Sequence, residues 1–296
     1  MKVVPRAYFI CPLDDTPLMP GDGWIGCAAG HRYDCAREGY FNLLPVQYKA
    51  SRDPGDDKAM VAARRRVVDS GVFTPLADAV FDFVRTLAMH RSDRVRPLRV
   101  VDAGCGEGYI LAHLQRCAAA CDDADSLELA GYDISKWAVR AAARHGTGIA
   151  WAVASNRQPP VEAASVDVLL SQFGFPHWPA FETMLASCAR LLTVDADSAH
   201  LMELRQVIYP QVDVAEVAPV PEALARGWQV LSERRLNYAV TLDTPQQIQD
   251  LIAMTPHAHR MSPDGRAALG AVKRAVVTMN MVIREWQPPR AEVSPL

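Results

Sequence analysis

The stretch VVDAGCGEG at Val100–Gly108 decides the fold. Apolar residues lead into it as the end of a strand, Asp102 closes that strand, and three alternate glycines precede a helical pattern that begins at Tyr109. Glycine lets a backbone bend sharply and lets a ligand come into contact with it, and the start of a helix offers free N–H groups. The stretch therefore predicts a strand-to-helix turn under a nucleotide-type ligand, with a tight turn that binds no ligand as the alternative.

A second strand-like segment, Leu129–Ser135, follows about one βαβ half-unit later and contains an acid, Asp133, near its end. In nucleotide-binding folds the acid after the second strand accepts hydrogen bonds from the ribose hydroxyls. A neutral side chain there would leave those donors unpaired, at about 1–3 kcal/mol for each buried group. We expect Asp133 to bind a ribose, and its alternative role is the N-cap of a helix that begins at Lys136.

The composition excludes several classes of protein. The chain has 296 residues, half of them hydrophobic, which is enough for one sizeable domain and a small one. It has no apolar run of the ~18–20 residues that cross a membrane and no long apolar signal core, so we expect a cytoplasmic protein without a membrane partner. Seven scattered cysteines argue against a disulfide framework.

The charge distribution does not by itself indicate a nucleic-acid-binding protein. The net charge is −3, whereas a strongly basic balance would have favoured nucleic acid. Two local basic clusters are present, Arg64–Arg66 and the arginines of Arg91–Arg99. Each is either a solvated face or a contact surface.

The N-terminal segment, residues 8–44, is rich in turn formers and contains two pairs of metal-binding residue types. The first pair is Cys11 and Asp14, and the second is Cys27 and His31. A segment this small needs a clip because it buries too little core, so we expect a zinc ion on these four residues. The alternatives are a site that recruits Asp15 or Cys35, and a module that packing alone holds together.

Several strings, in order along nearly the whole chain, resemble the RlmA family of 23S rRNA (guanine-N1)-methyltransferases. Gly-x-Gly-x-Gly preceded by an acid is similar to motif I of class I S-adenosylmethionine (SAM)-dependent methyltransferases, whereas flavin and nicotinamide folds use Gly-x-Gly-x-x-Gly. More specific to the family are the strings CPL at Cys11–Leu13, EGYFNLLPVQ at Glu38–Gln47, SRDPGD at Ser51–Asp56 and HLMEL at His200–Leu204.

The resemblance implies SAM as cofactor, zinc as metal and roles for individual residues. Cys11, Cys27 and His31 match three zinc ligands of the family, and Asp14 stands where the family has a cysteine. Phe73 falls where the family places a tyrosine against the cofactor. From the motifs and the resemblance together, the predicted cofactor-binding residues are Phe73, Asp102, Gly104, Gly106, Glu107, Asp133, Ile134, Ala154, Ser155 and His200. The family also acts as a dimer with the active-site cleft between the subunits, so we expect a homodimer.

The expected fold is α/β: a Rossmann-like class I methyltransferase with a mostly parallel, doubly wound seven-stranded sheet and a small N-terminal zinc-ribbon-like module. The expected division is residues 1–45 for the module, 46–90 for a helical linker region, 91–286 for the methyltransferase domain and 287–296 for a loose tail. Periodicity predicts helices over Lys58–Ser70, Leu76–Met89 and, with Thr244 as N-cap, Pro245–Met254. The remaining strands are expected at Ile149–Val153, Val166–Leu170, Arg190–Val194, Leu236–Leu242 and Ala275–Ile283.

The segment after the fourth strand, Ser171–Trp178, should open on the site of methyl transfer, because ligands bind outside the carboxyl ends of such strands. Its aromatic side chains favour stacking on a planar base, at ~1–3 kcal/mol per base. The alternatives are a pocket for a free heterocycle and aromatics that fill a gap under a loop. His177 is the candidate catalytic residue, as acceptor of the proton that guanine N1 loses.

The leading hypothesis is SAM-dependent N1-methylation of a guanine in a 23S rRNA hairpin. The alternative is a diverged methyltransferase that acts on a small heterocyclic substrate in natural-product biosynthesis. Its support comes from departures from the family: Asp14, the strand-four end, Ala186–Ala189 where many methyltransferases have a Lys-Pro-Gly-Gly turn, and Asp195-Ala-Asp197, which adds negative charge near the rim. A third hypothesis is a binding protein that keeps the SAM fold but transfers no methyl group.

Overall fold

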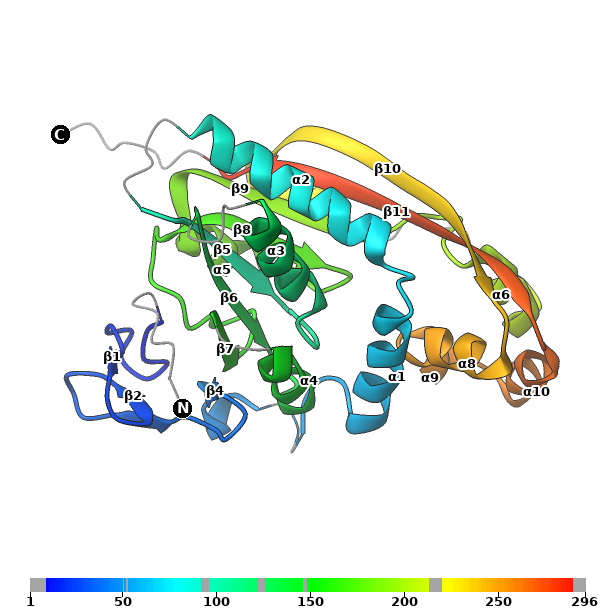
Figure 1. Ribbon diagram of the computed structural model, residues 1–296, viewed down its shortest axis with the longest axis horizontal. Helices are drawn as coiled ribbons and strands as arrows, with labels where there is room; N and C mark the ends of the chain where they lie inside the picture. Colours follow the sequence, from blue (N-terminus) through cyan, green and yellow to red (C-terminus); the bar gives the residue numbers. More distant parts are fainter. Residues whose placement is uncertain are drawn as a thin grey trace.

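An eight-stranded sheet forms the centre of the computed structural model, which describes residues 9–49, 51, 53–91, 96–121, 126–145, 148–212 and 220–289 (Figure 1). The strands are β4 (Tyr40–Asn42), β5 (Leu98–Ala103), β6 (Leu127–Asp133), β7 (Ile149–Val153), β8 (Val166–Gln172), β9 (Leu185–Ala196), β10 (Gln229–Leu242) and β11 (Ala275–Gln287). Their order is β10-β11-β9-β8-β5-β6-β7-β4, and β10 and β11 alone run antiparallel to their neighbours. The predicted α/β class is confirmed, with one strand more than expected.

The extra strand comes from the N-terminal segment, whose residues 40–42 pair in parallel with β7. The rest of that segment forms a separate antiparallel sheet of β1 (Met19–Pro20), β2 (Trp24–Gly26) and β3 (Arg32–Asp34). Phe9 bridges to Val161, and the backbone N–H of Ile10 donates to the carbonyl of Pro160 at 3.1 Å. The module therefore adheres to the main domain through backbone pairing at more than one point.

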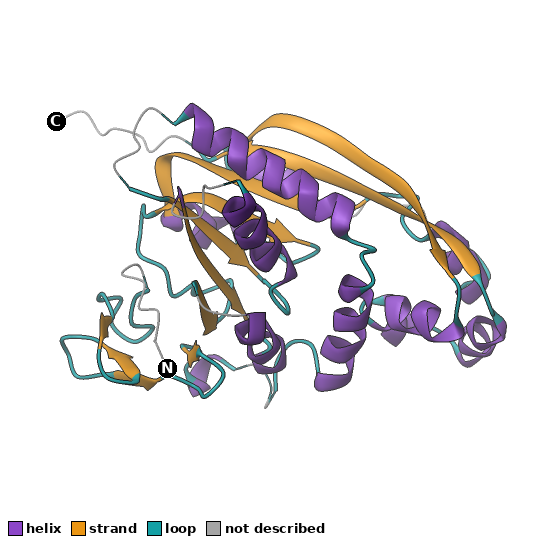
Figure 2. Ribbon diagram, in the orientation of Figure 1, coloured by secondary structure: helices purple, strands orange, loops and turns teal. Residues whose placement is uncertain are grey.

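Helices cover both faces of the central sheet (Figure 2). The helices of the described chain, including those of the C-terminal lobe, are α1 (Lys58–Asp69), α2 (Thr74–His90), α3 (Tyr109–Ala120), α4 (Lys136–Ala142), α5 (Trp178–Met184), α6 (Met202–Ile208), α7 (Val220–Ala225), α8 (Pro245–Ala253), α9 (His257–Arg260) and α10 (Pro263–Ala271). Successive strand residues point to opposite faces, so Val100 and Val101 belong to two different hydrophobic clusters. Within the part of the chain that is described, none of these helices has the length and apolarity needed to cross a bilayer.

The expected helices are present with small shifts at their ends, whereas β9 and β10 begin several residues before the expected starts at Arg190 and Leu236. Thr244 caps α8 in a capping box with Gln247, as predicted. The Ala186–Ala189 stretch is not a turn: α5 ends at Met184 and β9 begins at once, and the β8–β9 register shifts between Val166 and Val168. Of the expected loose tail, Gln287 closes β11, and residues 290–296 lie outside the described chain.

The C-terminal helices form a lobe at the far end of the long β10–β11 hairpin, and α1 packs against α8 of that lobe (Figure 1). Arg66 of α1 makes a bidentate pair with Asp250 of α8: Nε–Oδ2 is 2.7 Å and Nη2–Oδ1 is 2.6 Å. Asp250 is buried, so loss of Arg66 would leave a desolvated carboxylate without its cation. This pair holds the N-terminal helix and the C-terminal lobe together.

The predicted basic clusters are occupied by ion pairs within the chain. Arg64 pairs with Asp56, Arg65 with Asp69 and Arg66 with Asp250. In the second cluster Arg91 and Arg96 approach Asp167, and Arg99 pairs with Glu128, while Arg94 lies outside the described residues. The described arginines of both clusters are therefore engaged in ion pairs within the chain.

The glycines of the strand-to-helix turn have different tasks. Gly104, Gly106 and Gly108 all have positive φ, at 82°, 55° and 81°. A Cβ on Gly108 would lie 2.6 Å from the Trp151 ring and 2.8 Å from Cβ of Ala142, whereas a Cβ on Gly104 would meet nothing within 4 Å. Gly108 is thus required for packing, and Gly104 borders open space.

This difference predicts unequal costs for two matched substitutions. Gly104→Ala adds only left-handed strain, so the free energy of unfolding should fall by about 1–2 kcal/mol. Gly108→Ala adds overpacking to the same strain and should cost about 2–5 kcal/mol. Equilibrium urea unfolding of both variants measures the difference, and equal losses would contradict the packing role of Gly108.

Candidate functional site

A cavity of about 690 Å³ opens at the carboxyl ends of the parallel strands. It lies where the strand order reverses, since β6 and β7 continue on one side of β5 and β8 lies on the other. The lobe residues Leu251 and His257 line the opposite wall. All ten residues predicted to bind the cofactor line this one cavity: Phe73, Asp102, Gly104, Gly106, Glu107, Asp133, Ile134, Ala154, Ser155 and His200.

The floor of the cavity carries two buried carboxylates, each with one oxygen that accepts no hydrogen bond from the described residues. Asp102 is 2% exposed and Glu107 is 3% exposed. Among the described atoms, Asp102 Oδ1 and Glu107 Oε2 accept no hydrogen bond. Burial and the neighbouring charges of Asp133 and Glu107 raise the pKa of Asp102 to about 8. Buried acceptors of this kind fit a ligand with N–H donors or positive charge, and SAM carries both an ammonium and a sulfonium group.

Asp133 is held in one orientation by backbone donors. The N–H of Gly106 donates to Oδ2 at 3.0 Å, and the N–H of Ser135 donates to Oδ1 at 2.7 Å. The N-cap of α4 is Ser135, so the alternative role of Asp133 as that cap is wrong. A fixed carboxylate on the cavity wall, with lone pairs left over, is suited to accept from two ribose hydroxyls.

Arg64 reaches across the glycine loop from α1. It pairs with Asp56 at 2.5 Å, and its Nε lies 3.9 Å from Oε2 of Glu107. Its positive charge lowers the pKa of Glu107, although burial raises that pKa more. Sequence reasoning did not place Arg64 or Asp56 in the site, although Asp56 ends the SRDPGD string.

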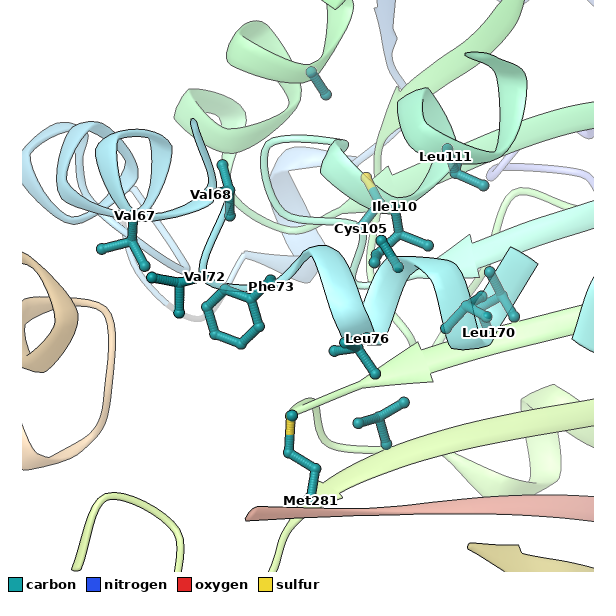
Figure 3. Close-up of a cluster of buried hydrophobic side chains, with 14 of the residues drawn as sticks. Val67, Val68, Val72, Phe73, Leu76, Cys105, Ile110, Leu111, Leu170 and Met281 are labelled. Carbon is teal, nitrogen blue, oxygen red and sulfur yellow. The ribbon is translucent and has the colours of Figure 1, made fainter. Parts of the chain in front are cut away.

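An aromatic cluster closes one side of the cavity. The ring of Phe173 lies 6.1 Å from that of Phe73, edge to face, and 6.1 Å from that of His200. Phe73 begins the turn into α2 beside Val72 and Leu76 (Figure 3). Burial lowers the pKa of His200 to about 4, so its ring is neutral near pH 7. Phe173 has a φ of 50°, a strained backbone of the kind that concentrates at functional sites.

The aromatic residues after β8 divide into separate roles. Trp178 is fully buried and contacts Trp228 and Trp286 at ring distances of 5.2 and 5.5 Å, so it fills the core. His177 lines the cavity and caps α5, where its Nδ1 accepts from the N–H of Ala180 at 3.4 Å. That contact occupies the nitrogen that would take up a proton, and the role of His177 as proton acceptor stays a prediction.

The predicted metal-binding residues converge in the N-terminal module. One potential ligand atom from each of Cys11, Asp14, Cys27 and His31 lies within 4.8 Å of the others, and within the described chain this group includes neither Asp15 nor Cys35. His31 Nδ1 lies 3.5 Å from Cys11 Sγ, 3.3 Å from Cys27 Sγ and 3.0 Å from Asp14 Oδ2. Tetrahedral zinc with ordinary bond lengths separates its ligands by about 3.3–3.8 Å. The two distances from His31 to sulfur fall in this range and the distance to Asp14 is shorter, so the donor set fits zinc after a small outward shift of the Asp14 carboxylate.

Two further residues orient these donors. Thr16 donates from its hydroxyl at 2.6 Å and its N–H at 3.1 Å to Oδ1 of Asp14, which leaves Oδ2 directed at the other ligands. The Thr16 and Cys27 contacts lower the pKa of Asp14. Tyr33 Oη lies 3.2 Å from Cys11 Sγ, and burial raises the pKa of Tyr33, so its hydroxyl keeps its proton and can donate to a zinc-bound thiolate. Neither residue was singled out from the sequence.

Comparisons with known proteins match both parts of the chain. The zinc-ribbon family described as RlmA, N-terminal, matches residues 9–52, and the family described as Methyltransferase domain matches residues 100–195. The 23S rRNA (guanine(748)-N(1))-methyltransferase of Streptomyces fradiae is 32% identical over 259 residues, which cover 87% of this chain and 88% of that protein. YxjB of Bacillus subtilis (strain 168), provisionally named a 23S rRNA (guanine-N(1)-)-methyltransferase, is 30% identical over 288 residues, or 95% of this chain and 98% of its own.

The pKa of Asp102 predicts how stability depends on pH in the ligand-free protein. The carboxyl titrates near pH 8 when folded and near pH 3.9 when unfolded, so the folded state holds the extra proton between these values. Its contribution therefore makes the free energy of unfolding fall as pH rises from about 4 to 8, by at most about 1.4 kcal/mol per pH unit. Asp102→Asn should flatten this slope in urea unfolding at several pH values. Asp82→Asn, an exposed change on α2, is the control, and an unchanged slope in Asp102→Asn would refute the prediction.

Proposed function

The chain belongs to the family of 23S rRNA (guanine-N1)-methyltransferases, and from this membership we propose that it transfers a methyl group from SAM to N1 of a guanine in 23S rRNA. The observation that carries the proposal is identity of 30–32% to such relatives over 87–95% of the chain. The cavity agrees with it, because the carboxyl edge of the sheet offers acceptors suited to the cofactor.

SAM, when bound, supplies an electrophilic methyl group on its sulfonium, so the enzyme has mainly to align a nucleophile with it. We assign Asp133 to the ribose hydroxyls, and Asp102 and Glu107 to the positively charged amino acid end. Phe73, Phe173 and His200 exclude water from one side of the cavity. Guanine N1 loses a proton as it is methylated, and His177 remains the candidate acceptor, provided that its cap on α5 opens.

The negative charges that favoured a small-molecule substrate are neutralised within the chain. Asp195 Oδ2 lies 3.2 Å from Nη1 of Arg284, and Asp197 Oδ2 lies 3.0 Å from Nε of Arg235. The Asp195-Ala-Asp197 departure therefore adds no unpaired carboxylate, and its repulsion of RNA phosphates is reduced, although the same two arginines also pair with Glu233. The other departures, at Asp14, the strand-four end and Ala186–Ala189, do not favour a heterocyclic substrate over RNA.

We assign the four-residue group of the N-terminal module to a structural zinc ion held by Cys11, Asp14, Cys27 and His31. A site with four protein ligands leaves no open position for catalysis, so its task is to hold the module together. The proposal also places the protein in the cytoplasm, because its substrate is ribosomal RNA. The homodimer implied by the family resemblance stays a prediction.

The zinc assignment predicts different effects for two neighbouring acids. Asp14→Asn removes a charged ligand and should weaken zinc binding more than about tenfold in competition with a chelator. Asp15→Asn is the matched control, because Asp15 is exposed and asparagine tolerates its φ of 57°. Elemental analysis should find one zinc per chain in the wild type, and equal zinc affinity in the two variants would exclude Asp14 as a ligand.

The function is tested with methyl-labelled SAM, supplied separately with unmodified 23S rRNA and with an RNA-free small-molecule extract of the source cells. Label should enter the RNA and map to guanine N1. Asp133→Asn, at limiting SAM, should lower transfer on the order of 5- to 150-fold, the equivalent of 1–3 kcal/mol of unpaired hydrogen bonding. Label confined to a low-mass heterocycle, or label in neither sample, would contradict the proposal.

A further inference from the structure

Two segments at the mouth of the cavity are tied to each other. Asn156 and Arg157 follow β7, and Phe173–His177 follows β8. The side-chain amide of Asn156 donates to the backbone carbonyl of Phe175 at 3.0 Å. This bond fixes the backbone at Phe175 while leaving its side chain free of it.

The Phe175 ring stands in water at this mouth. It is 89% exposed, the most exposed large hydrophobic side chain among the described residues, although it lines the cavity. Phe173 is 44% exposed and has ring contacts with Phe73 and His200, and Trp178 lies in the core. Of the aromatic residues after β8, Phe175 is thus the one that presents a whole ring face to an incoming molecule.

Arg157, which follows Asn156 in the chain, brings a positive charge to the same cavity as Phe175. Its side chain is exposed and lines the cavity, and the described residues provide it with no acidic partner. By contrast, Arg64 and Arg66 on the nearby helix and Arg284 on β11 are each paired with a carboxylate. The charge of Arg157 is therefore available to an anion from outside.

We propose that Phe175 and Arg157 form an RNA-binding rim, in which the Phe175 ring stacks on an unpaired base of the substrate hairpin and Arg157 pairs with an adjacent phosphate. This inference rests on the proposed function and adds to it the residues that receive the RNA. An exposed ring and an exposed guanidinium that line one cavity match the two chemical features of a single-stranded nucleotide, a planar base and a phosphate.

The rim would also help the target guanine to leave the stem, which the reaction requires. A guanine inside a stem cannot reach the cavity unless it leaves the stack, which costs a few kcal/mol. Stacking on Phe175 would repay part of that cost at the place where the base must enter. Phosphate pairing by Arg157 would fix the position of the strand without reading its sequence.

The test measures binding of a fluorescently labelled, unmodified 23S rRNA hairpin by anisotropy at several salt concentrations. Phe175→Leu keeps an apolar side chain without a ring and should weaken binding about 5- to 150-fold, with an unchanged salt slope. Phe175→Tyr should bind like the wild type. Arg157→Ala should weaken binding and reduce the slope of log K against log salt by about 0.7–0.9.

The controls are Arg85→Ala on α2 and Leu224→Ala on α7, an exposed cation and an exposed apolar side chain away from the cavity. SAM binding by calorimetry should be unchanged in the Phe175 variants, which separates loss of RNA contact from damage to the cofactor site. If Phe175→Leu and Arg157→Ala bind RNA as the controls do while the wild type methylates it, the rim is wrong and the proposed function stands. If the wild type neither binds nor methylates RNA, both fail.

Discussion

Three carboxylates at the carboxyl edge of one parallel sheet are the constraint on which the rest of the site depends. Asp102 and Glu107 are buried and Asp133 is fixed by two backbone donors, so like charges are concentrated where water is scarce. The guanidinium of Arg64 is drawn to this place from α1, which brings an N-terminal helix over the glycine loop. Protonation of Asp102 relieves the remaining repulsion while no cationic ligand is present.

The position of α1 in turn sets the walls of the cavity. Arg66 ties α1 to Asp250 of α8, so the helix that covers the glycine loop also carries the C-terminal lobe. The cavity is thus enclosed by parts of the chain as far apart in sequence as Gly55 and His257. Loss of Arg66 would leave the buried Asp250 carboxylate without its cation, which is strongly destabilising. The effect would reach the cavity wall, because Leu251, which follows Asp250, lines the cavity.

The N-terminal module and the main domain are also joined by contacts between residues far apart in the chain, which local sequence patterns do not predict. The residues of β4 complete the edge of the central sheet, and Phe9 and Cys11 share a hydrophobic cluster with strands β5 and β6. A zinc ion on the four-residue group would hold together a segment whose own core is small. Through β4, the module connects the candidate zinc site to the central sheet, at whose edge the cavity lies.

The sequence by itself determined most of the helices and strands and a set of residues that line one cavity. Apolar periodicity and the glycine turn are local signals, so the parallel strands, α1, α8 and the roles expected of Asp102, Gly104 and Asp133 could be predicted from them. Only the tertiary structure decided which side chains are paired or buried within the molecule and which remain accessible to a ligand. Arginines that look alike in sequence are paired, as Arg66 is, or open, as Arg157 is, and neighbouring aromatics are buried, as Trp178 is, or exposed, as Phe175 is. Burial and ion pairing depend on partners far away in the chain, and no local pattern carries that information.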